Sequence, residues 1–243
     1  MSWIELIWRG LCAGLSIGLG GFLFIITLFI KQILKADVVE KLFKLVGSLL
    51  FSVGLYMVCM LSLQLYTGKI GLIYTSHITF NVVGQLCVML MFNVIGSGGL
   101  GYACYWIFKR TKILDVVSDI ATTKTALTCF NDYFTSFVNS ILCGACVFMA
   151  VKCYQTKRKP LLMVFIAWFV FSGYEHCIAD VFYYTFANAF TLNALLSIII
   201  NIVGNSIGPG LVFYMWADID HDGSDVVHDG SDHDNANDAA PIT

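Results

Sequence analysis

Charge is what this sequence lacks most. Only 12% of its 243 residues are charged and 58% are hydrophobic, whereas a soluble domain carries about 25% charged residues. A soluble fold of this length could not bury so much apolar surface, so lipid must cover most of it. Lys and Arg are absent from residues 218–243, which hold eight Asp and three His. We therefore predict one membrane domain, residues 1–217, followed by a disordered acidic tail, residues 218–243.

We also expect neither paired cysteines nor a cleavable leader segment. The nine cysteines lie mostly inside apolar runs and their number is odd, so they do not indicate a disulfide framework. Cys143 and Cys146 form a CxxC pair, but on a helix this spacing only places both thiols on one face. The first apolar run is too long for a cleavable signal peptide. We expect no cofactor, no bound metal and no nucleic-acid partner.

Long apolar runs predict six membrane segments. The first run, residues 11–30, has 20 residues, and about 20 helical residues cross the hydrocarbon core. Runs at 45–68 and 133–151 predict two more crossings, and the run at 70–108 predicts a polar turn followed by one helix over 81–108. The charged stretches between these segments, residues 31–44 and 109–132, are predicted as loops.

The fifth segment is interrupted by ionisable residues. Residues 160–174 are too few to cross, and they stop at Glu175, His176 and Asp180 before the apolar stretch 181–217. A charge at the bilayer centre costs about 2.5–3.5 kcal/mol even on the mildest scale. These side chains should therefore face protein or a water-lined cavity.

A second interruption, at residues 65–68 in the second segment, occupies the corresponding place in the first half of the chain. The halves share another signature, because the NVIGSG of residues 93–98 returns as NSIGPG at 205–210. With three segments per half, the second half enters the membrane in the opposite sense, as in inverted-repeat transporters with a substrate site near the midplane. We predict an all-α membrane protein, aquaporin-like, with six helices in two inverted three-helix repeats and helices 2 and 5 interrupted.

These motifs resemble the formate/nitrite transporter family from about Arg9 to Trp216. The resemblance implies a homopentamer in the lipid bilayer, each subunit with its own pore for a small monovalent anion, such as formate, nitrite or hydrosulfide, or for its neutral acid. The matching stretches are KLVG at 44–47, FSVGL at 51–55, LYT at 65–67, SGYEHCIA at 172–179 and GNSIG at 204–208.

The resemblance also implies roles for single residues. Hydroxyl, amide and imidazole donors between two apolar constrictions would compensate an anion for its lost hydration, and helix ends freed by the breaks would favour negative charge. The central histidine could give a proton to a weak-acid anion or simply bond to it, so passive conduction and proton-coupled movement both stay open. The constrictions would be Phe51, Leu55 and Phe169; the polar contacts would be Thr67, His176 and Asn205; Leu65, Tyr66 and Asp180 complete the predicted pore set.

Two residues depart from the family pattern. Gly144 and Asp180 each stand where an asparagine is usual in relatives. Asp180 follows His176 by four residues, so in an unbroken helix both side chains would share one face. An ionised carboxylate there would favour the imidazolium, which predicts that His176 is more readily protonated than in relatives.

The tail contains the opening of a calcium-binding loop, with aspartates at 218, 220 and 222, Gly223, and Asp229 at the twelfth position. Its last ligand is Asp rather than Glu and no helix is expected after it. We therefore favour a disordered tail over weak divalent-metal binding.

Three other functions compete with anion transport. An aquaporin-like neutral-solute channel should carry two Asn-Pro-Ala motifs, and none occurs among the three prolines. An intramembrane enzyme using Glu175, His176 and Asp180 would need a second catalytic cluster, and His77 is the only other histidine of the membrane body, so we expect no enzyme. A non-transporting structural or sensor protein stays an alternative. By family analogy both termini are cytoplasmic, although six basic residues inside against eight outside do not support this orientation.

Overall fold

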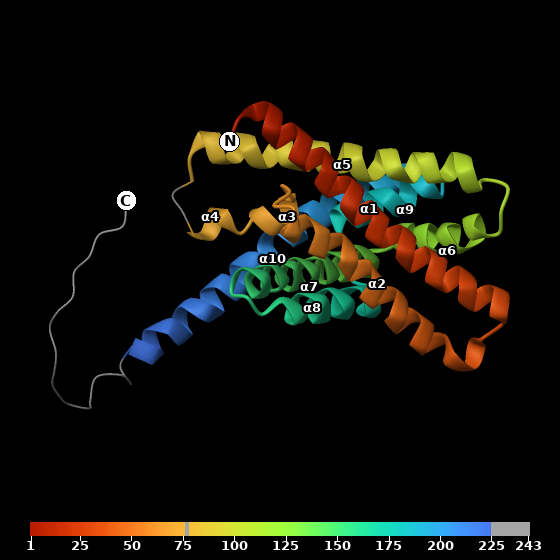
Figure 1. Cartoon of the computed structure of the whole chain (residues 1–243). Helices are drawn as coiled ribbons and strands as arrows, with labels where there is room; N and C mark the ends of the chain where they lie inside the picture. Colours follow the sequence, from red (N-terminus) through yellow and green to blue (C-terminus); the bar gives the residue numbers. More distant parts are fainter. Residues whose placement is uncertain (76–77, 225–243) are drawn as a thin grey trace, which may run out of the picture.

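A computed structural model of the chain describes residues 1–75 and 78–224, and within these ranges all regular structure is helical (Figure 1). Five helices are long and apolar enough to cross a membrane, and a sixth crossing is a pair of shorter helices bent by 53° at a break. The predicted all-helical membrane fold with a broken fifth span is therefore confirmed. The five long helices are α1 (Trp3–Leu34), α2 (Glu40–Met60), α5 (Phe80–Phe108), α7 (Phe130–Gln155) and α10 (Leu192–Ser224); the bent pair is α8 (Lys159–Ser172) and α9 (Cys177–Phe186).

The short elements lie between these spans. The 3-10 turn η1 (Asp37–Val39) joins α1 to α2. After α2, an irregular stretch at residues 61–65 leads into two single-turn helices, α3 (Tyr66–Lys69) and α4 (Leu72–Thr75). The interruption predicted at residues 65–68 therefore begins earlier, and Tyr66, Thr67 and Gly68 belong to α3. The amphipathic helix α6 (Ile113–Thr125) lies between α5 and α7.

Two predicted loops are wrong in extent. The first span is longer at both ends, because Ser2 caps α1 by accepting from the Glu5 N–H at 3.2 Å and the helix continues to Leu34. The loop predicted over 31–44 is therefore reduced to a short connection. The stretch 109–132, also predicted as a loop, contains α6.

Helix α6 could have been found from its spacing. Ile113, Val117 and Ala121 recur every four residues and are all buried, which is the pattern of a helix with one apolar face. Charged residues stand between these apolar positions, so the stretch contains no long charge-free run that would mark it as a helix.

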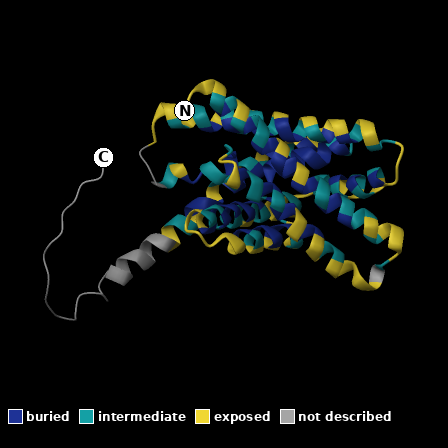
Figure 2. Cartoon of the chain, viewed as in Figure 1, coloured by how far each residue is buried: buried dark blue, intermediate teal, exposed yellow. Residues whose placement is uncertain are grey.

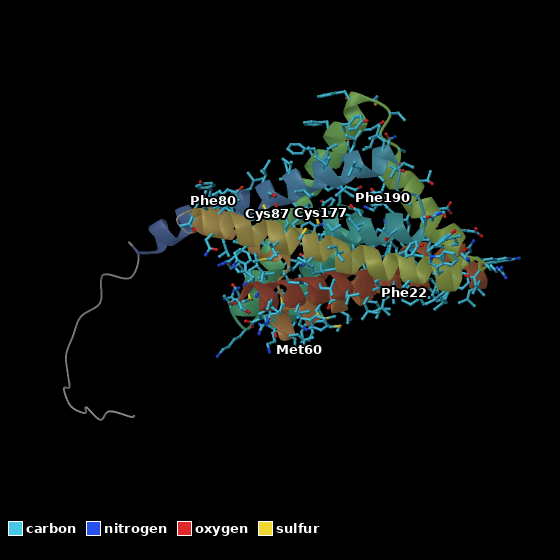
Figure 3. The ribbon with its side chains drawn as sticks, turned by 90° about the horizontal axis from the view of Figure 1, so that it is seen from above. Phe22, Met60, Phe80, Cys87, Cys177 and Phe190 are labelled. Carbon is cyan, nitrogen blue, oxygen red and sulfur yellow. The ribbon has the colours of Figure 1, made fainter. Side chains whose placement is uncertain are left out.

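The packing repeats between the halves. Helix α1 packs on α5 and α2, and α7 packs in the same way on α10 and α8; the view from above shows α1 and α5 side by side (Figure 3). Figure 2 shows buried residues gathered where helices meet and exposed ones along outward faces such as that of α5. That face carries Met91, Ile95, Tyr102 and Trp106, all about half exposed, as expected of a lipid-facing surface.

Glycines allow the closest helix contacts at matching places in both halves. A Cβ on Gly144 of α7 would collide with the backbone of Asn205 on α10, and a Cβ on Gly14 of α1 would collide with the backbone of Asn93 on α5. An asparagine could not replace Gly144 without separating α7 from α10. Gly96 and Gly208 complete the two crossings from the other side.

Helix α10 continues to Ser224, past the predicted start of the tail at residue 218. Asp229 of the calcium-loop pattern and the rest of the acidic tail lie outside the described residues, as does His77. The prediction of a disordered tail therefore stays a prediction.

Candidate functional site

The break between α8 and α9 begins with a left-handed residue. Gly173 has φ +77°, a conformation that glycine adopts without steric cost. The N–H groups of Gly173 and Tyr174 bond back to the carbonyls of Val170 and Phe169 at 3.1 and 3.0 Å, which closes α8 as a Schellman-type end. The chain then turns through Glu175 and His176 before α9 starts at Cys177.

An asparagine from the last helix holds this break in place. Asn205 Oδ1 accepts from the Cys177 N–H at 3.0 Å, and its Nδ2 donates to the carbonyls of Glu175 at 2.9 Å and Ser140 at 2.8 Å. Both amide hydrogens of this fully buried side chain are therefore engaged with backbone. Asn205, predicted as a polar contact for the substrate, is here a support for the break.

The first half uses the same device. Asn93 Oδ1 accepts from the Tyr66 N–H at 2.7 Å, and its Nδ2 donates to the carbonyls of Gln64 at 2.9 Å and Gly10 at 2.8 Å. The predicted pore residue Tyr66 sends its hydroxyl to Ser206 Oγ at 2.8 Å, against α10. Asn93 was not among the predicted site residues, although the repeated NVIGSG and NSIGPG motifs place it opposite Asn205.

His176 and Thr67 meet where the two breaks approach each other. His176 caps α9, and its Nδ1 accepts from the Ala179 N–H at 3.2 Å. A ring nitrogen that accepts a hydrogen bond carries no proton, so the imidazole is neutral with its hydrogen on Nε2. Nε2 lies 3.0 Å from Thr67 Oγ1. Thr67 therefore accepts, and its own hydroxyl hydrogen is available to a further acceptor.

Aromatic rings adjoin this pair. The Phe169 ring stacks on the His176 ring at a centroid distance of 5.8 Å, and the Phe51 ring meets Phe169 edge-on at 5.8 Å. All three side chains are buried. The histidine therefore lies under an apolar lid contributed by α2 and α8.

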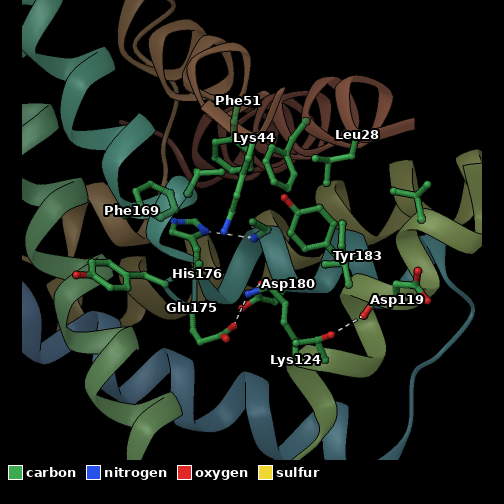
Figure 4. Close-up of a pocket in the computed structure, with 18 of the residues that line it drawn as sticks. Leu28, Lys44, Phe51, Asp119, Lys124, Phe169, Glu175, His176, Asp180 and Tyr183 are labelled. Atoms are coloured by element: carbon green, nitrogen blue, oxygen red, sulfur yellow. Dashed lines mark hydrogen bonds and ion pairs between the residues drawn. The ribbon is translucent and has the colours of Figure 1, made fainter. Parts of the chain in front are cut away.

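A cavity of about 620 Å³ reaches this lid from one end of the bundle (Figure 4). Phe51, Phe169 and His176 line it together with Asp180 and charged residues of α1, α2 and α6. Of the predicted pore set, four residues therefore gather at this first cavity.

A second cavity of about 370 Å³ is lined by Leu55 and Leu65, with Arg9 and Lys69 also on its walls. Helix α1 gives Arg9 to this cavity and Lys31 to the first, and these two positions are about 33 Å apart along a helix. The two cavities therefore open toward opposite ends of the bundle. Thr67, Tyr66 and Asn205 line neither cavity.

A buried ionic cluster forms one wall of the first cavity (Figure 4). Lys124 Nζ lies 2.5 Å from Glu175 Oε2 and 3.0 Å from Asp180 Oδ1. Asp180 Oδ2 accepts from Asn201 Nδ2 at 2.9 Å, and Asn201 Oδ1 accepts from Ser140 Oγ at 2.7 Å. Sequence reasoning missed Lys124 because it placed this residue in a loop.

Lys124 lies near the end of α6, outside the membrane-spanning helices. Burial lowers the pKa of its ammonium, but the charges of Asp180 and Glu175 outweigh burial and hold that pKa well above its ordinary value. Lys124 is therefore a permanent positive charge in the wall of the cavity.

The predicted influence of Asp180 on His176 is not what the structure shows. The Asp180 N–H does bond to the His176 carbonyl at 2.9 Å, within the first turn of α9. The two side chains then diverge, because Asp180 turns to Lys124 and Asn201 while the imidazole turns to Thr67. Asp180 forms an ion pair with Lys124. The Ala179 N–H, by bonding to Nδ1, fixes the neutral tautomer of His176.

Comparison with known proteins agrees with this architecture. The sequence profile of the family described as "Formate/nitrite transporter" matches residues 1–217. The chain is 31% identical over 183 residues to the formate channel FocA of Haemophilus influenzae, an alignment that covers 71% of this chain and 63% of that relative. The chain thus spans somewhat less than two thirds of the length of this curated relative.

Two solved structures have the same fold. A pentameric formate channel with formate bound superposes with a TM-score of 0.75 at 22% identity, covering 90% of this chain and 97% of the other. An FNT family ion channel superposes with a TM-score of 0.69 at 20% identity, covering 88% and 90%. The fold is that of a multi-pass integral membrane protein, and transporters rather than enzymes make up the matched family, as the sequence predicted. This chain belongs to the formate/nitrite transporter family.

Proposed function

We propose that this protein moves small monovalent weak-acid anions, formate or a close relative of it, across the membrane. The observation that carries the proposal is that two cavities reach the two breaks from opposite ends of the bundle. The first is lined by His176 and the second by Leu65 and Gly68, which lie on either side of Thr67 in the chain. On α2, Phe51 lines the first cavity and Leu55, one helical turn later, lines the second. Only about 6 Å of helix rise separates these two positions.

Phe51 and Phe169 then form one apolar constriction and Leu55 with Leu65 forms the other. Such constrictions exclude water and larger solutes, so an anion between them needs donors in place of its hydration. His176 and Thr67 are both buried and uncharged in this arrangement; the His176 Nε2–H donates to Thr67 Oγ1, and the Thr67 hydroxyl hydrogen is available to a solute. Neutral donors suit a solute that passes either as the anion or as its neutral acid, since the acid crosses apolar surroundings at far lower cost.

The lipid-facing surface supports a further part of the proposal, a homopentamer in which each chain contains its own path. The relative of known structure with formate bound is pentameric, and large apolar side chains remain exposed along α5 and α10 of the single chain. We also propose that both termini face the cytoplasm, which an even number of crossings allows.

Uptake into proteoliposomes tests the proposal. The purified full-length protein should admit at least one of labelled formate, nitrite, hydrosulfide or lactate faster than protein-free vesicles do. Water and glycerol fluxes should stay at the protein-free level, which separates anion transport from an aquaporin-like function. Absence of flux for all four anions across a pH series would favour the non-transporting structural or sensor protein.

A further inference from the structure

Two carboxyl groups share one ammonium group in the wall of the first cavity. Glu175 and Asp180 are both bonded to Lys124 Nζ, at 2.5 and 3.0 Å, so their carboxyl groups are held beside one ammonium group. The side chains of Lys124, Glu175 and Asp180 are only 14%, 11% and 1% exposed. With both acids ionised, the cluster would hold an uncompensated negative charge away from bulk water, which is strongly unfavourable.

No second cation in the part of the chain that the structure describes pairs with the two acids. Among the described residues, the ion pairs of Glu175 and Asp180 are with Lys124 alone. Helix α10 faces the cluster with the neutral side chains of Asn201 and Ser197, and the adjacent His176 is neutral because its Nδ1 accepts from backbone.

The other titratable groups around the cluster are thiols, phenols and one more acid. Helix α7 contributes a thiol and α9 contributes a thiol and two tyrosines, none of which supplies positive charge. Helix α6 adds an exposed carboxylate that lines the same cavity. On the far walls of the cavity, Lys31 pairs with Glu40 and Lys44 lies over the Phe171 ring. The groups on α6, α7 and α9 are Asp119, Cys143, Cys177, Tyr183 and Tyr184.

A shared proton resolves the imbalance. When two carboxyl groups in contact cannot both ionise, one proton binds to the pair. Asp180 already accepts on both oxygens, from Lys124 and from Asn201. Glu175 lines the cavity next to His176 and accepts from Lys124 on Oε2. Its other oxygen can therefore hold the proton and exchange it with the cavity.

From this geometry we infer that Glu175 and Asp180 share one exchangeable proton, and that this pair is the proton-loading site for the transported weak acid. The inference rests on the proposed transport function and adds the residues that couple it to protons. It assigns Asp180 as the residue that gives the cluster its titratable proton.

The step is a single proton transfer. An anion in the first cavity takes the proton from Glu175: the O–H bond of the carboxylic acid breaks, an O–H bond forms on the anion, and the electron pair stays on the carboxylate. Lys124 stabilises the second negative charge that results. The neutral acid passes the constriction at Phe51 and Phe169, and a proton from water in the cavity reloads the pair.

Infrared spectroscopy of the full-length protein in liposomes tests for the proton directly. The wild-type protein at neutral pH should show the C=O stretching band of a buried carboxylic acid. Asp180→Asn leaves one carboxylate facing one ammonium, so the band should disappear. Asp180→Glu keeps two carboxyl groups and should keep the band. Asp119→Asn is the matched control, because it removes a carboxylate that lines the same cavity without contacting Lys124, and it should leave the band unchanged.

Transport gives the second readout. The anion's own protonation changes with pH in every variant, so the ratio of wild-type to Asp180→Asn uptake isolates the cluster. This ratio should fall about tenfold over the pH series, in the direction of rising pH, as the wild-type pair loses its proton. The ratio of wild-type to Asp180→Glu uptake should stay constant over the same range.

A wild-type protein without the carboxylic-acid band, or one whose band survives Asp180→Asn, overturns the inference. If Asp180→Asn does not fold, Glu175→Gln removes the other half of the pair and should abolish the band in the same way. The two proposals fail separately. A band with no anion flux contradicts the transport function alone, whereas anion flux with no band contradicts only the proton-loading pair.

Discussion

The break after α2 and the break between α8 and α9 are built alike but carry different side chains. In each, an asparagine of the half's last helix bonds to the backbone on both sides of one residue, Leu65 in the first break and His176 in the second. Four residues after these positions stand Lys69 and Asp180. The two breaks thus share a backbone arrangement, while the side chains at the equivalent positions differ: Leu65 is apolar and His176 forms hydrogen bonds.

The largest effect is expected from removing Asn93 and Asn205, the two asparagines that bond to the backbone of the breaks. Asn93→Ala and Asn205→Ala each leave two carbonyls and one N–H without their buried partner, and each orphaned group costs about 1–3 kcal/mol. We expect both variants to lose about 3 kcal/mol or more of stability, measured by unfolding in detergent. Ser206→Ala removes one hydroxyl contact, to the Tyr66 side chain, and leaves the backbone bonds at both breaks in place, so it should cost far less. A large loss for one asparagine and none for the other would mean that the two breaks are not equivalent.

Replacing His176 with leucine places in the second break the residue type that the first break has at the equivalent position, Leu65. His176→Leu removes the donor near Thr67. Since one buried hydrogen bond contributes about 1.4 kcal/mol, which is a factor of ten in rate, we expect the flux to fall about tenfold or more. His176→Asn, which keeps an N-cap and an amide donor, should retain more transport than His176→Leu. Equal uptake by the wild type and His176→Leu would contradict the role proposed for the imidazole.

The matching helix crossings can be tested at Gly144. Gly144→Ala places a methyl group against the Asn205 backbone, so α7 and α10 must separate, at a cost of about 1–3 kcal/mol. Gly99→Ala is the matched control, because a Cβ there meets nothing within 4 Å. Thermal unfolding should show a lower midpoint for the first variant and an unchanged or higher one for the second.

The smallest effect is expected from the charges of the second cavity. Lys69 lines that cavity, at the place that Asp180 occupies in the other half. Lys69→Gln should slow anion entry about twofold at low ionic strength and less at high salt, since steering by an exposed charge is screened. Initial uptake rates at two salt concentrations measure this, and a salt-independent change would argue against steering.

The candidate site could be predicted only in part. The break in the fifth span led to His176, since a span interrupted by polar residues is visible in the sequence. Thr67, Phe51 and Phe169 were predicted from the resemblance to the family. Asn205 was predicted as a contact for the substrate, whereas the structure shows its amide bonded to backbone; nothing in the sequence tells whether an amide in a membrane bonds to a solute or to backbone. Lys124 was missed because its surroundings contain several charges, and only burial of one face of α6 shows which of them turns inward.

The sequence by itself determined the number of spans, the position of both breaks and the inverted repeat. These features depend on local properties, namely how long an apolar run is and where glycine and polar residues interrupt it. Only the tertiary structure decided which charges neutralise one another and which amides hold the breaks. Lys124 reaches Glu175 and Asp180 from another helix, and such pairings depend on how two oppositely oriented halves pack, which residue order along the chain does not encode locally.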